Sequence, residues 1–369
     1  MIADIFIILS STIILLYMIM ISMFAFAWFL RKENISSKKT ITKKISVIVA
    51  FRNEEKNLDK LLKSLLNQSY KDYEIILIND HSNDNSTHVI NQIKNEKIKL
   101  YDLPDEFQGK KHALRYGAKH SDGEILFFTD ADCIIPPEWI SETYSYMLEK
   151  DIKMLCGPVR FYNNPGIFSK LVQLEFLSMT GSGAAGTFLG LAFMCNGANY
   201  AIEKNIFSEA SAFFNDKYSS GDDVFLLHYV SGKYKVDFIK NRKCIIDTKA
   251  PENLKELFVQ RVRWASKTSG YKTPVSIITA ALTFLMSFIL LVSLIAGFFK
   301  FIYIYLFITA FFIKIFTDTL FMIPVLNFYR KSNLIWFIPL LQIFYPFYIV
   351  ITGILSLFWH PLWKGRRVK

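Results

Sequence analysis

The chain has 369 residues, of which 52% are hydrophobic and 16% aromatic. Such a length allows two ordinary domains, or one soluble domain with added membrane helices, and the uneven spread of apolar residues favours the second organisation. The formal net charge of +11 is compatible with a nucleic acid partner, but no basic stretch contains a recognisable base-reading motif. Because much of the positive charge flanks long apolar stretches, a membrane surface is the better anionic partner and no nucleic acid is expected. The four cysteines lack metal-ligand spacing, which indicates free thiols in a reducing compartment.

The first long apolar stretch covers residues 5–30 and exceeds the roughly 20 residues that span a bilayer. It is too long for a signal-peptide core, and nothing resembling a cleavage site follows it. Residues 1–31 therefore predict a transmembrane helix. Asp4 precedes this stretch and several lysines and arginines follow it, so the positive-inside rule places the next domain in the cytoplasm. Residues 32–44 form the expected polar linker.

After the linker, short apolar runs alternate with amphipathic helical stretches, which predicts an α/β domain with a mainly parallel sheet covered by helices. We expect this domain to cover residues 44–250. Leucines at helical spacing predict a helix near residues 58–66, and Pro136 and Pro137 are expected in the first turn of another helix. Strands are expected at residues 45–50, 74–78, 98–101, 125–128 and 154–158.

Two carboxylates, Asp130 and Asp132, follow the predicted strand at residues 125–128. If the backbone there is extended, both side chains project to the same side. The carboxyl end of a strand is where open α/β sheets bind ligands. Paired hard oxygen ligands suit Mg²⁺ or Mn²⁺, although a solvated acidic turn is the alternative reading of this triplet.

Other polar residues lie at comparable places along the predicted sheet. Residues 79–86 form a polar string after the second strand, where they either cap a turn and helix or place Asp80 to accept hydrogen bonds from a base or ribose. Lys110 opens a helix and either reaches a diphosphate or is simply solvated. Asp222 and Asp223 lie at a helix start, where carboxylates serve as caps or as a general base.

Residues 195–199 contain small side chains that would let a substrate approach the backbone closely. The apolar segment 166–194 carries Lys170, Gln173 and Glu175, and a membrane span there would put the later motifs on the wrong side. We therefore expect a helix on the membrane surface followed by a flexible loop. Residues 251–272 predict an amphipathic interface helix, with Gln260 to Trp264 on it.

The C-terminal region, residues 274–359, contains three further apolar stretches of spanning length, at 275–298, 303–324 and 334–358. Lys314 and Asp318 are one helical turn apart, and we interpret them first as a structural pair and second as part of an acceptor channel. The basic residues before and after the last stretch cannot both be cytoplasmic if it crosses once. Either that stretch is re-entrant or the positive-inside rule fails there.

Four ordered elements of the chain resemble membrane-bound family 2 glycosyltransferases, a group that includes enzymes similar to cellulose synthase, hyaluronan synthase and ceramide glucosyltransferase. The elements are residues 48–54, 79–86, 129–132, and 221–223 followed by 260–264. The match extends from residue 45 to about residue 268. It implies a GT-A fold, a Mg²⁺ or Mn²⁺ cofactor and inverting transfer from a nucleotide sugar.

The resemblance also implies roles for single residues. The donor nucleotide would be bound by Asn53, Glu54, Asp80, Lys110 and Asp130, and the metal by Asp132 and Asp130. Asp223 would be the general base. The diphosphate and acceptor side would involve Asp222, Asn196, Gly197, Gln260, Arg263 and Trp264. His81 stands where the family usually has a second aspartate, and Gly221 with Asp222 replaces Thr-Glu.

Together these features predict single displacement of a nucleoside diphosphate, since one base and one metal suffice for it. We expect a UDP-sugar donor and a lipid or glycan acceptor, lipid being preferred. The expected location is a bacterial plasma membrane with the catalytic domain in the cytoplasm. A processive polysaccharide synthase and an inactive membrane scaffold are the competing hypotheses.

Overall fold

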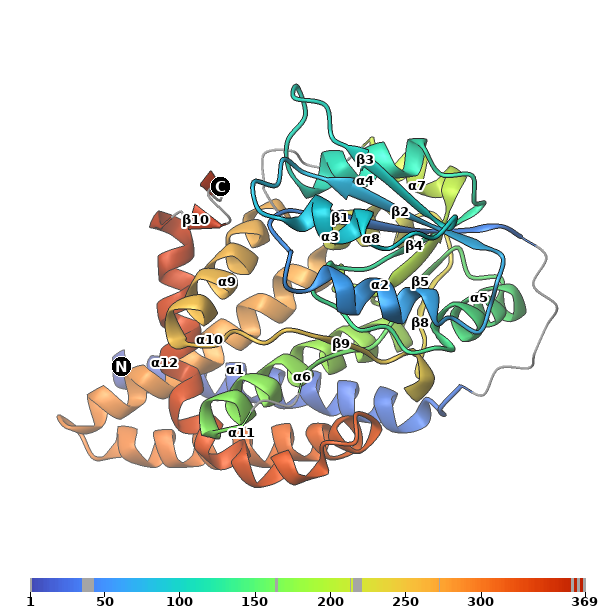
Figure 1. Cartoon of the computed structure of the whole chain (residues 1–369). Helices are drawn as coiled ribbons and strands as arrows, with labels where there is room; N and C mark the ends of the chain where they lie inside the picture. Colours follow the sequence, from blue (N-terminus) through green and yellow to red (C-terminus); the bar gives the residue numbers. More distant parts are fainter. Residues whose placement is uncertain are drawn as a thin grey trace. The chain divides into compact units, whose positions relative to one another are not determined.

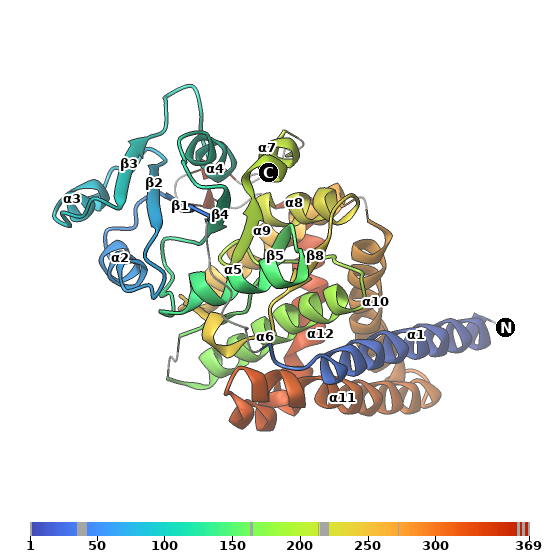
Figure 2. The ribbon, with the colours of Figure 1, turned by 90° about the vertical axis from the view of Figure 1, so that its right-hand side faces the viewer.

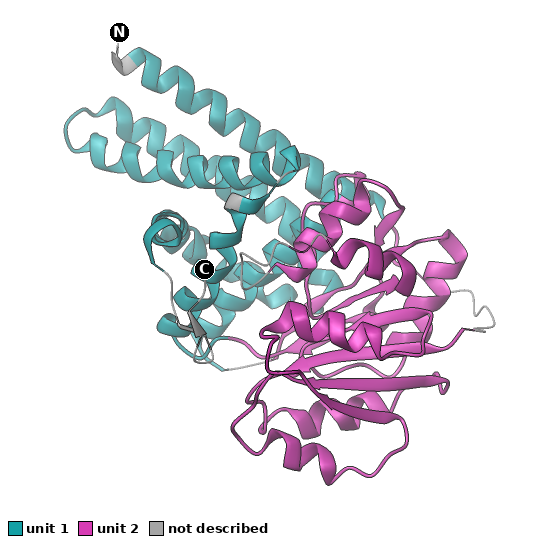
Figure 3. Cartoon of the chain, turned by 90° about the horizontal axis from the view of Figure 1, so that it is seen from above, with its two compact units in different colours: residues 1–31, 164–186, 251–361 teal, residues 32–163, 187–250, 362–369 magenta. Residues whose placement is uncertain are grey.

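The computed structural model describes residues 2–34, 43–162, 165–212, 214, 221–271, 273–359, 362–363 and 366–367. The chain divides into two compact units, each assembled from separate segments (Figure 3). The helical unit consists of Met1–Arg31, Asn164–Gly186 and Pro251–Pro361. The sheet unit consists of Lys32–Asn163, Thr187–Ala250 and Leu362–Lys369. Residues 164–186, which lie inside the predicted domain 44–250, thus group with the helical segments.

In its described part, the sheet unit contains a seven-stranded sheet with strand order β3-β2-β1-β4-β7-β5-β8. β1 pairs in parallel with β2 and β4, whereas β7 runs antiparallel to both β4 and β5. The predicted mainly parallel sheet is therefore confirmed. The strands are β1 (Ile45–Phe51), β2 (Tyr73–Asn79), β3 (Ile98–Asp102), β4 (Ile125–Phe128), β5 (Met154–Cys156), β7 (Tyr200–Glu203) and β8 (Val236–Phe238).

The central strands are buried on both faces, as expected for near-continuous apolar runs in a parallel sheet. Ile45 aligns with Tyr73 on one side and with Ile125 on the other, so the carboxyl ends of β1, β2 and β4 meet at one edge of the sheet. The described residues also form two smaller sheets, one of β6 (Val159–Phe161) with β9 (Ile246–Thr248) and one of β10 (Leu362–Trp363) with β11 (Arg366–Arg367).

Helices cover the main sheet, and α2 and α4 lie on different sides of β1 and β2 (Figures 1 and 2). The apolar positions predicted for α2 are buried at Leu58, Leu61, Leu62 and Leu65. The helices of this unit are α2 (Leu58–Leu66), α3 (Ser86–Asn91), α4 (Lys110–Lys119), α5 (Trp139–Lys150), α7 (Lys204–Ser211), α8 (Asp222–Ser231) and the 3-10 turn η1 (Arg242–Cys244).

The start of α5 differs from the prediction that Pro136 and Pro137 occupy its first turn. Glu138 is the N-cap with a non-helical ψ of 3°, and the helix begins at Trp139. Both prolines lie in the preceding turn, which is closed by a hydrogen bond from the Trp139 N–H to the Pro136 carbonyl at 3.1 Å. The buried Trp139 ring packs edge-on against Phe127 of β4, with ring centroids 5.0 Å apart, and this fixes the start of the helix.

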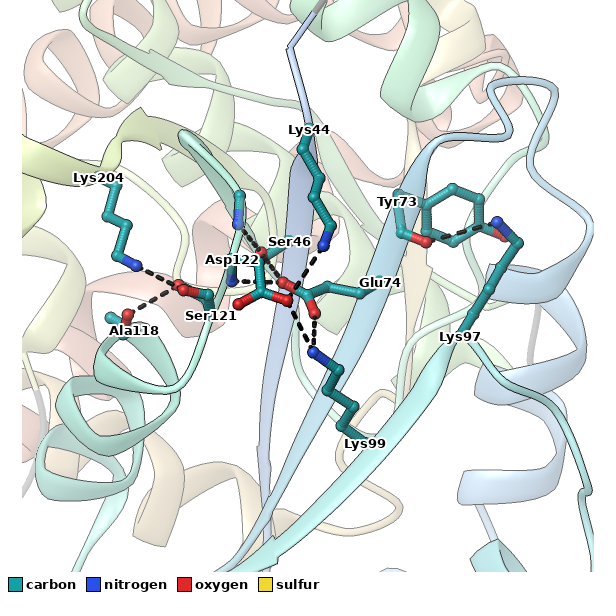
Figure 4. Close-up of polar contacts among 11 residues, drawn as sticks. Lys44, Ser46, Tyr73, Glu74, Lys97, Lys99, Ala118, Ser121, Asp122 and Lys204 are labelled. Atoms are coloured by element: carbon teal, nitrogen blue, oxygen red, sulfur yellow. Dashed lines mark hydrogen bonds and ion pairs between the residues drawn. The ribbon is translucent and has the colours of Figure 1, made fainter.

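A buried carboxylate ties together the amino ends of the first strands (Figure 4). Glu74 accepts hydrogen bonds from the Ser46 hydroxyl and the Asp122 N–H, both at 2.6 Å, and its other oxygen lies 2.7 Å from Lys99 Nζ. Asp122 pairs with Lys99 at 2.9 Å and with Lys44 at 3.0 Å. Burial alone would raise the pKa of Glu74, but hydrogen bonds from Lys99 and Ser46 outweigh it and lower that pKa. This network cross-links β1, β2, β3 and the loop before β4.

Four helices of the helical unit are long and apolar enough, within the described residues, to cross a membrane: Asp4–Leu30, Pro274–Gly297, Ile302–Phe328 and Ser332–Phe358. The protein is accordingly a membrane protein, as predicted. Pro324 does not end its helix, which continues to Phe328. The helical elements are α1 (Ile2–Leu30), α6 (Ile167–Phe188), α9 (Leu254–Ser266), η2 (Lys267–Gly270), α10 (Pro274–Gly297), α11 (Ile302–Phe328), η3 (Ser332–Phe337) and α12 (Ile338–Phe358).

The packing of α6 differs from the predicted helix on a membrane surface. Residues 172–177 are all buried, and a Cβ added at Gly181 would lie 3.0 Å from Val325 and 3.3 Å from Phe321 of α11. Glu175 forms an ion pair with Arg261 of α9. α6 is therefore an inner helix of this unit, because its acid finds a partner there and its small residues allow close helix packing.

Candidate active site

Lys110 is the centre of a charged cluster at the carboxyl edge of the main sheet. Its Nζ lies 2.6 Å from Asp130 Oδ1 and 3.4 Å from Asp222 Oδ2. Burial opposes the charged form of this amine, but the carboxylates of Asp130, Asp222 and Asp223 outweigh it and raise the pKa of Lys110 well above its ordinary value. The structure thus places a positive charge between an acid from the loop after β4 and an acid at the start of α8 (Asp222–Ser231).

Gly109 explains how Lys110 reaches this place. Its φ of 93° lies in the left-handed region that favours glycine, and it turns the chain sharply into α4. The Gly109 N–H donates a hydrogen bond to Asp80 Oδ1 at 3.1 Å. Asp80, at the end of β2, therefore anchors the start of the helix that carries Lys110.

Asp130 and Asp132 are not arranged as an extended strand would arrange them. β4 ends at Phe128, and the Cys133 N–H bonds to the Asp130 carbonyl at 3.3 Å to close a turn. The side chain of Asp130, 37% exposed, pairs with Lys110, whereas Asp132 Oδ1 accepts a hydrogen bond from the Thr248 hydroxyl at 3.2 Å. The extended backbone that the alternation argument requires is therefore absent at residues 131–132, although both acids do lie at the strand's carboxyl end as predicted.

Asp130 and Asp132 suit a divalent metal ion whose remaining coordination positions are filled by substrate and water. Across the described part of the chain, no group of three or more His, Cys, Asp or Glu side chains is placed to hold a metal ion. Mg²⁺ and its analogues commonly take one or two protein carboxylates and fill the other positions with water and substrate phosphates. Asp130 and Asp132 supply hard oxygen donors of that kind, so the residues present fit such an ion.

The acids at the start of α8 have different surroundings. Asp222 is only 4% exposed, and its buried Oδ2 faces the Lys110 ammonium at 3.4 Å. Asp223 is less buried. Its Oδ1 accepts a hydrogen bond from the Val224 N–H at 2.8 Å and its Oδ2 accepts one from the Gly197 N–H at 3.0 Å. Asp222 thus balances Lys110, while Asp223 is oriented by backbone donors.

Gly197 lies against this cluster, as its small size suggested. A Cβ at this position would be 3.1 Å from Lys110 Nζ, 3.4 Å from Asp223 Oδ2 and 3.6 Å from Asp222 Oδ2. Asn196 shapes the turn, because its side-chain oxygen accepts a hydrogen bond from the Ala198 N–H at 3.0 Å. The structure therefore brings Gly197 together with the charged residues, whereas the Asn196 side chain forms a hydrogen bond within its own turn.

Asn53 and Glu54 belong to a two-loop clasp, which we define as residues 53–55 after β1 and residues 82–86 after β2. Backbone N–H groups of the first loop donate to side chains of the second loop. Backbone N–H groups of the second loop donate in the same way to side chains of the first loop. The bonds are Asn53 N–H to Ser82 at 3.0 Å, Glu54 N–H to Ser86 at 2.8 Å, Glu55 N–H to Asp84 at 3.1 Å, Asn83 N–H to Asn53 at 2.9 Å and Asn85 N–H to Glu55 at 3.0 Å. Most of the polar string at 79–86 thus serves this clasp.

His81, the departure noted in the sequence, sits between two acids. Its Nδ1 lies 3.2 Å from Asp80 Oδ1, and its Nε2 lies 3.4 Å from Asp105 Oδ1. Its φ of 58° is unusual for a residue with a side chain. Asp80 is buried and shares one oxygen between His81 and Gly109, so base binding by Asp80 stays a prediction.

Gln260, Arg263 and Trp264 lie on α9 in the helical unit. Sequence reasoning missed Arg261, whose guanidinium is buried against Glu175 of α6, donates to the Gln260 side-chain oxygen and lies 4.3 Å from the centre of the Trp264 ring. An isolated acid in the apolar segment 166–194 was the signal that could have indicated a buried basic partner. Arg261 therefore organises the two predicted site residues next to it.

Comparison with known proteins defines the class. Residues 46–209 match the family described as Glycosyl transferase family 2. The chain contains a family 2 glycosyltransferase domain, and its four apolar helices fit a membrane-bound member of this family. The resemblance seen in the sequence is confirmed.

Particular relatives agree with this class. The chain is 26% identical over 225 residues to the poly-beta-1,6-N-acetyl-D-glucosamine synthase of Staphylococcus aureus, and 29% identical over 229 residues to that of Staphylococcus epidermidis. Each match covers 60% of this chain and 53% of the synthase, so the chain matches about half the length of these relatives.

One solved structure shares the fold over almost the whole chain. The mannosyltransferase PcManGT from Pyrobaculum calidifontis, solved in complex with GDP-Man and Mn²⁺, aligns with a TM-score of 0.59 and 14% identity. The alignment covers 96% of this chain and 98% of the mannosyltransferase. The predicted GT-A fold class with transmembrane helices is thereby confirmed.

Proposed function

We propose that the protein transfers a sugar, with inversion, from a nucleotide sugar to a hydroxyl group of a membrane-associated acceptor. The observation that carries this proposal is the Lys110 ammonium held between Asp130 and Asp222 beside Asp223. A fixed cation suits a leaving diphosphate, and an adjacent acid suits an attacking hydroxyl. The relatives are named as polysaccharide synthases, and the structural neighbour was solved with GDP-Man and Mn²⁺.

Departure of the nucleoside diphosphate requires stabilisation of its growing negative charge. Lys110 would supply a positive charge that is present before the substrate arrives, so little reorganisation is needed. Asp130 and Asp132 would hold a Mg²⁺ or Mn²⁺ ion, which neutralises phosphate charge when bound. The roles that the resemblance gives to Gln260, Arg263 and Trp264 stay predictions.

The attacking hydroxyl must lose its proton as its oxygen bonds to the anomeric carbon. We assign Asp223 as the general base, because its carboxylate is more accessible than that of Asp222 and is not the nearest counter-ion of Lys110. The anomeric carbon–oxygen bond breaks, its electron pair leaves with the diphosphate, and the proton passes to Asp223. Attack opposite the leaving group inverts the anomeric centre.

We further propose a UDP-sugar donor, a lipid acceptor and a catalytic domain in the bacterial cytoplasm. Four apolar helices support the membrane-bound acceptor, and the basic linker after α1 supports the orientation. A reporter fused after Lys44 is expected to behave as cytoplasmic, and periplasmic behaviour there would contradict the orientation.

A processive polysaccharide synthase is the second candidate function, because the named relatives make a polymer. Reconstitution of the purified protein in lipid vesicles separates the two candidates. Products of one added sugar support single transfer. Chains longer than a few sugars support the synthase.

The test of the catalytic assignments separates donor binding from transfer. Donor screening begins with UDP-N-acetylglucosamine and GDP-mannose in the presence of Mn²⁺. Asp132→Ala is expected to weaken metal-dependent donor binding and transfer together. Asp223→Asn is expected to slow single-turnover transfer by about 10²–10⁴-fold with little change in calorimetric donor affinity.

Asp222→Asn is the matched variant for the neighbouring acid. If Asp222 is the base, the selective loss of transfer will follow Asp222→Asn instead, and Asp223→Asn will transfer at nearly the wild-type rate. That pattern would overturn the assignment of Asp223. Absence of transfer from every nucleotide sugar by the intact protein would overturn the proposed function itself.

A further inference from the structure

The helical unit contains a cavity of about 70 Å³ whose wall is polar, although it lies among membrane-spanning helices. Its polar lining comes from five helices. The residues are Tyr17 on α1, Ser178 on α6, Thr283 on α10, Lys314 and Asp318 on α11, and Gln342 and Tyr345 on α12. Polar groups at membrane depth are costly and are usually retained for binding or for packing against one another.

The charges of this cavity cancel. Lys314 is 1% exposed, and its Nζ lies 2.5 Å from Asp318 Oδ2 and 3.1 Å from the Tyr17 hydroxyl. The Tyr17 hydroxyl in turn donates to Asp318 Oδ1 at 2.9 Å. The predicted pairing of Lys314 with Asp318 is confirmed. Because its cation is already neutralised, the cavity offers no surplus positive charge for a phosphate.

The hydrogen bonds show what an occupant must supply. A carboxylate only accepts, so Gln342 directs its NH₂ group to Asp318 Oδ2, at 2.6 Å. The Gln342 side-chain oxygen is then buried, with no hydrogen-bond partner among the described residues. The hydroxyls of Ser178 and Thr283 already donate to the carbonyls of their own helices, at 2.7 and 2.8 Å, and keep only acceptor capacity.

We propose that this cavity binds the hydroxyl-bearing headgroup of a neutral membrane lipid of the diacylglycerol type. An O–H donor satisfies the unpaired Gln342 oxygen and the two hydroxyl acceptors. The cavity is small, at about 70 Å³, which suits a hydroxymethyl group rather than a whole sugar ring. Four of the lining helices are candidate spans, so such a ligand reaches the cavity from the bilayer.

The test uses the full-length protein in mild detergent and titrates 1,2-dioctanoylglycerol against its melting temperature. We expect a saturable rise in melting temperature. Ser178→Ala and Thr283→Val are each expected to weaken the apparent affinity about two- to tenfold, the usual effect of losing one hydrogen bond. Gln342→Leu is expected to weaken it further.

Ser293→Ala is the matched control. Ser293 is also a buried serine of a spanning helix whose hydroxyl donates to its own helix, to Ile289 O at 2.6 Å, but it does not line the cavity. This variant is expected to keep wild-type affinity. Equal weakening by Ser293→Ala and Ser178→Ala would overturn the proposal.

Two other outcomes also decide against it. If dioctanoylglycerol gives no saturable rise in melting temperature, water alone fills the cavity. If dioctanoyl phosphatidic acid binds more tightly than dioctanoylglycerol, the site prefers a charged headgroup and its neutral chemistry has been misjudged. Preference for the neutral lipid, lost in the cavity variants, supports the proposal.

Discussion

The Glu175–Arg261 pair is expected to dominate the stability of the helical unit. Glu175 is 7% and Arg261 4% exposed, and the guanidinium makes two hydrogen bonds to the carboxylate. Burial works against the charged form of Arg261, but the Glu175 carboxylate outweighs it and raises the pKa of Arg261. Arg261 is therefore charged at every pH near neutrality.

The expected magnitude follows from this burial. Arg261→Met leaves the Glu175 carboxylate buried without its main partner, and such a loss costs about 3–5 kcal/mol. Replacing both residues, as in Glu175→Leu with Arg261→Met, removes the stranded charge, so most of that loss should be recovered. The exposed pair of Lys63 and Asp59, 2.8 Å apart on α2, is the control, and Asp59→Asn should cost only about 0.3–0.5 kcal/mol.

Unfolding of the purified variants in one detergent, followed by circular dichroism, measures these free energies. A double-mutant cycle then gives the coupling between Glu175 and Arg261. The reasoning would be refuted if Arg261→Met were no more destabilising than Asp59→Asn. It would also fail if the double variant were less stable than Arg261→Met alone.

Three further predictions concern the sheet unit. Hydrogen bonds from Lys99 and Lys44 lower the pKa of Asp122 to about 2. The contribution of this carboxylate to stability is therefore complete above about pH 4 and is lost as the pH falls towards 2. Asp122→Asn should flatten the acid-denaturation curve between these pH values. Gly123→Ala would place a Cβ 2.5 Å from a backbone nitrogen of β1, so a fall in melting temperature of several degrees is expected. Gly197→Ala would place a methyl group 3.1 Å from the nearest charged nitrogen of the site, and should lower turnover at least tenfold while the circular dichroism spectrum is unchanged.

The sequence predicted the parts of the fold whose signals are local. β1, β2 and β4 are buried on both faces, and their continuous apolar runs stand out between polar turns. β7 and β8 were missed, because each is only three or four residues long and is defined by pairing with distant strands. Local patterns carry no information about such pairing.

The same limit applies to the candidate site. Asp130 and Lys110 were identified from their places at a strand end and a helix start, but their contact at 2.6 Å depends on how the loops meet. Alternation along a strand does not extend to Asp132, since β4 ends at Phe128 and a turn runs from Asp130 to Cys133. No role was predicted for Arg261, because its partner lies 86 residues earlier, in a segment that was expected to lie on a membrane surface.

That separation of 86 residues has a consequence for biogenesis. At about 5–20 residues per second, the ribosome needs roughly 4–17 s after Glu175 before it has made Arg261. During this interval an apolar helix carries an acid with no counter-ion, so α6 cannot take its final place until α9 has been translated. Nascent chains arrested before α9 are therefore expected to be recognised by quality-control proteases that spare the completed protein.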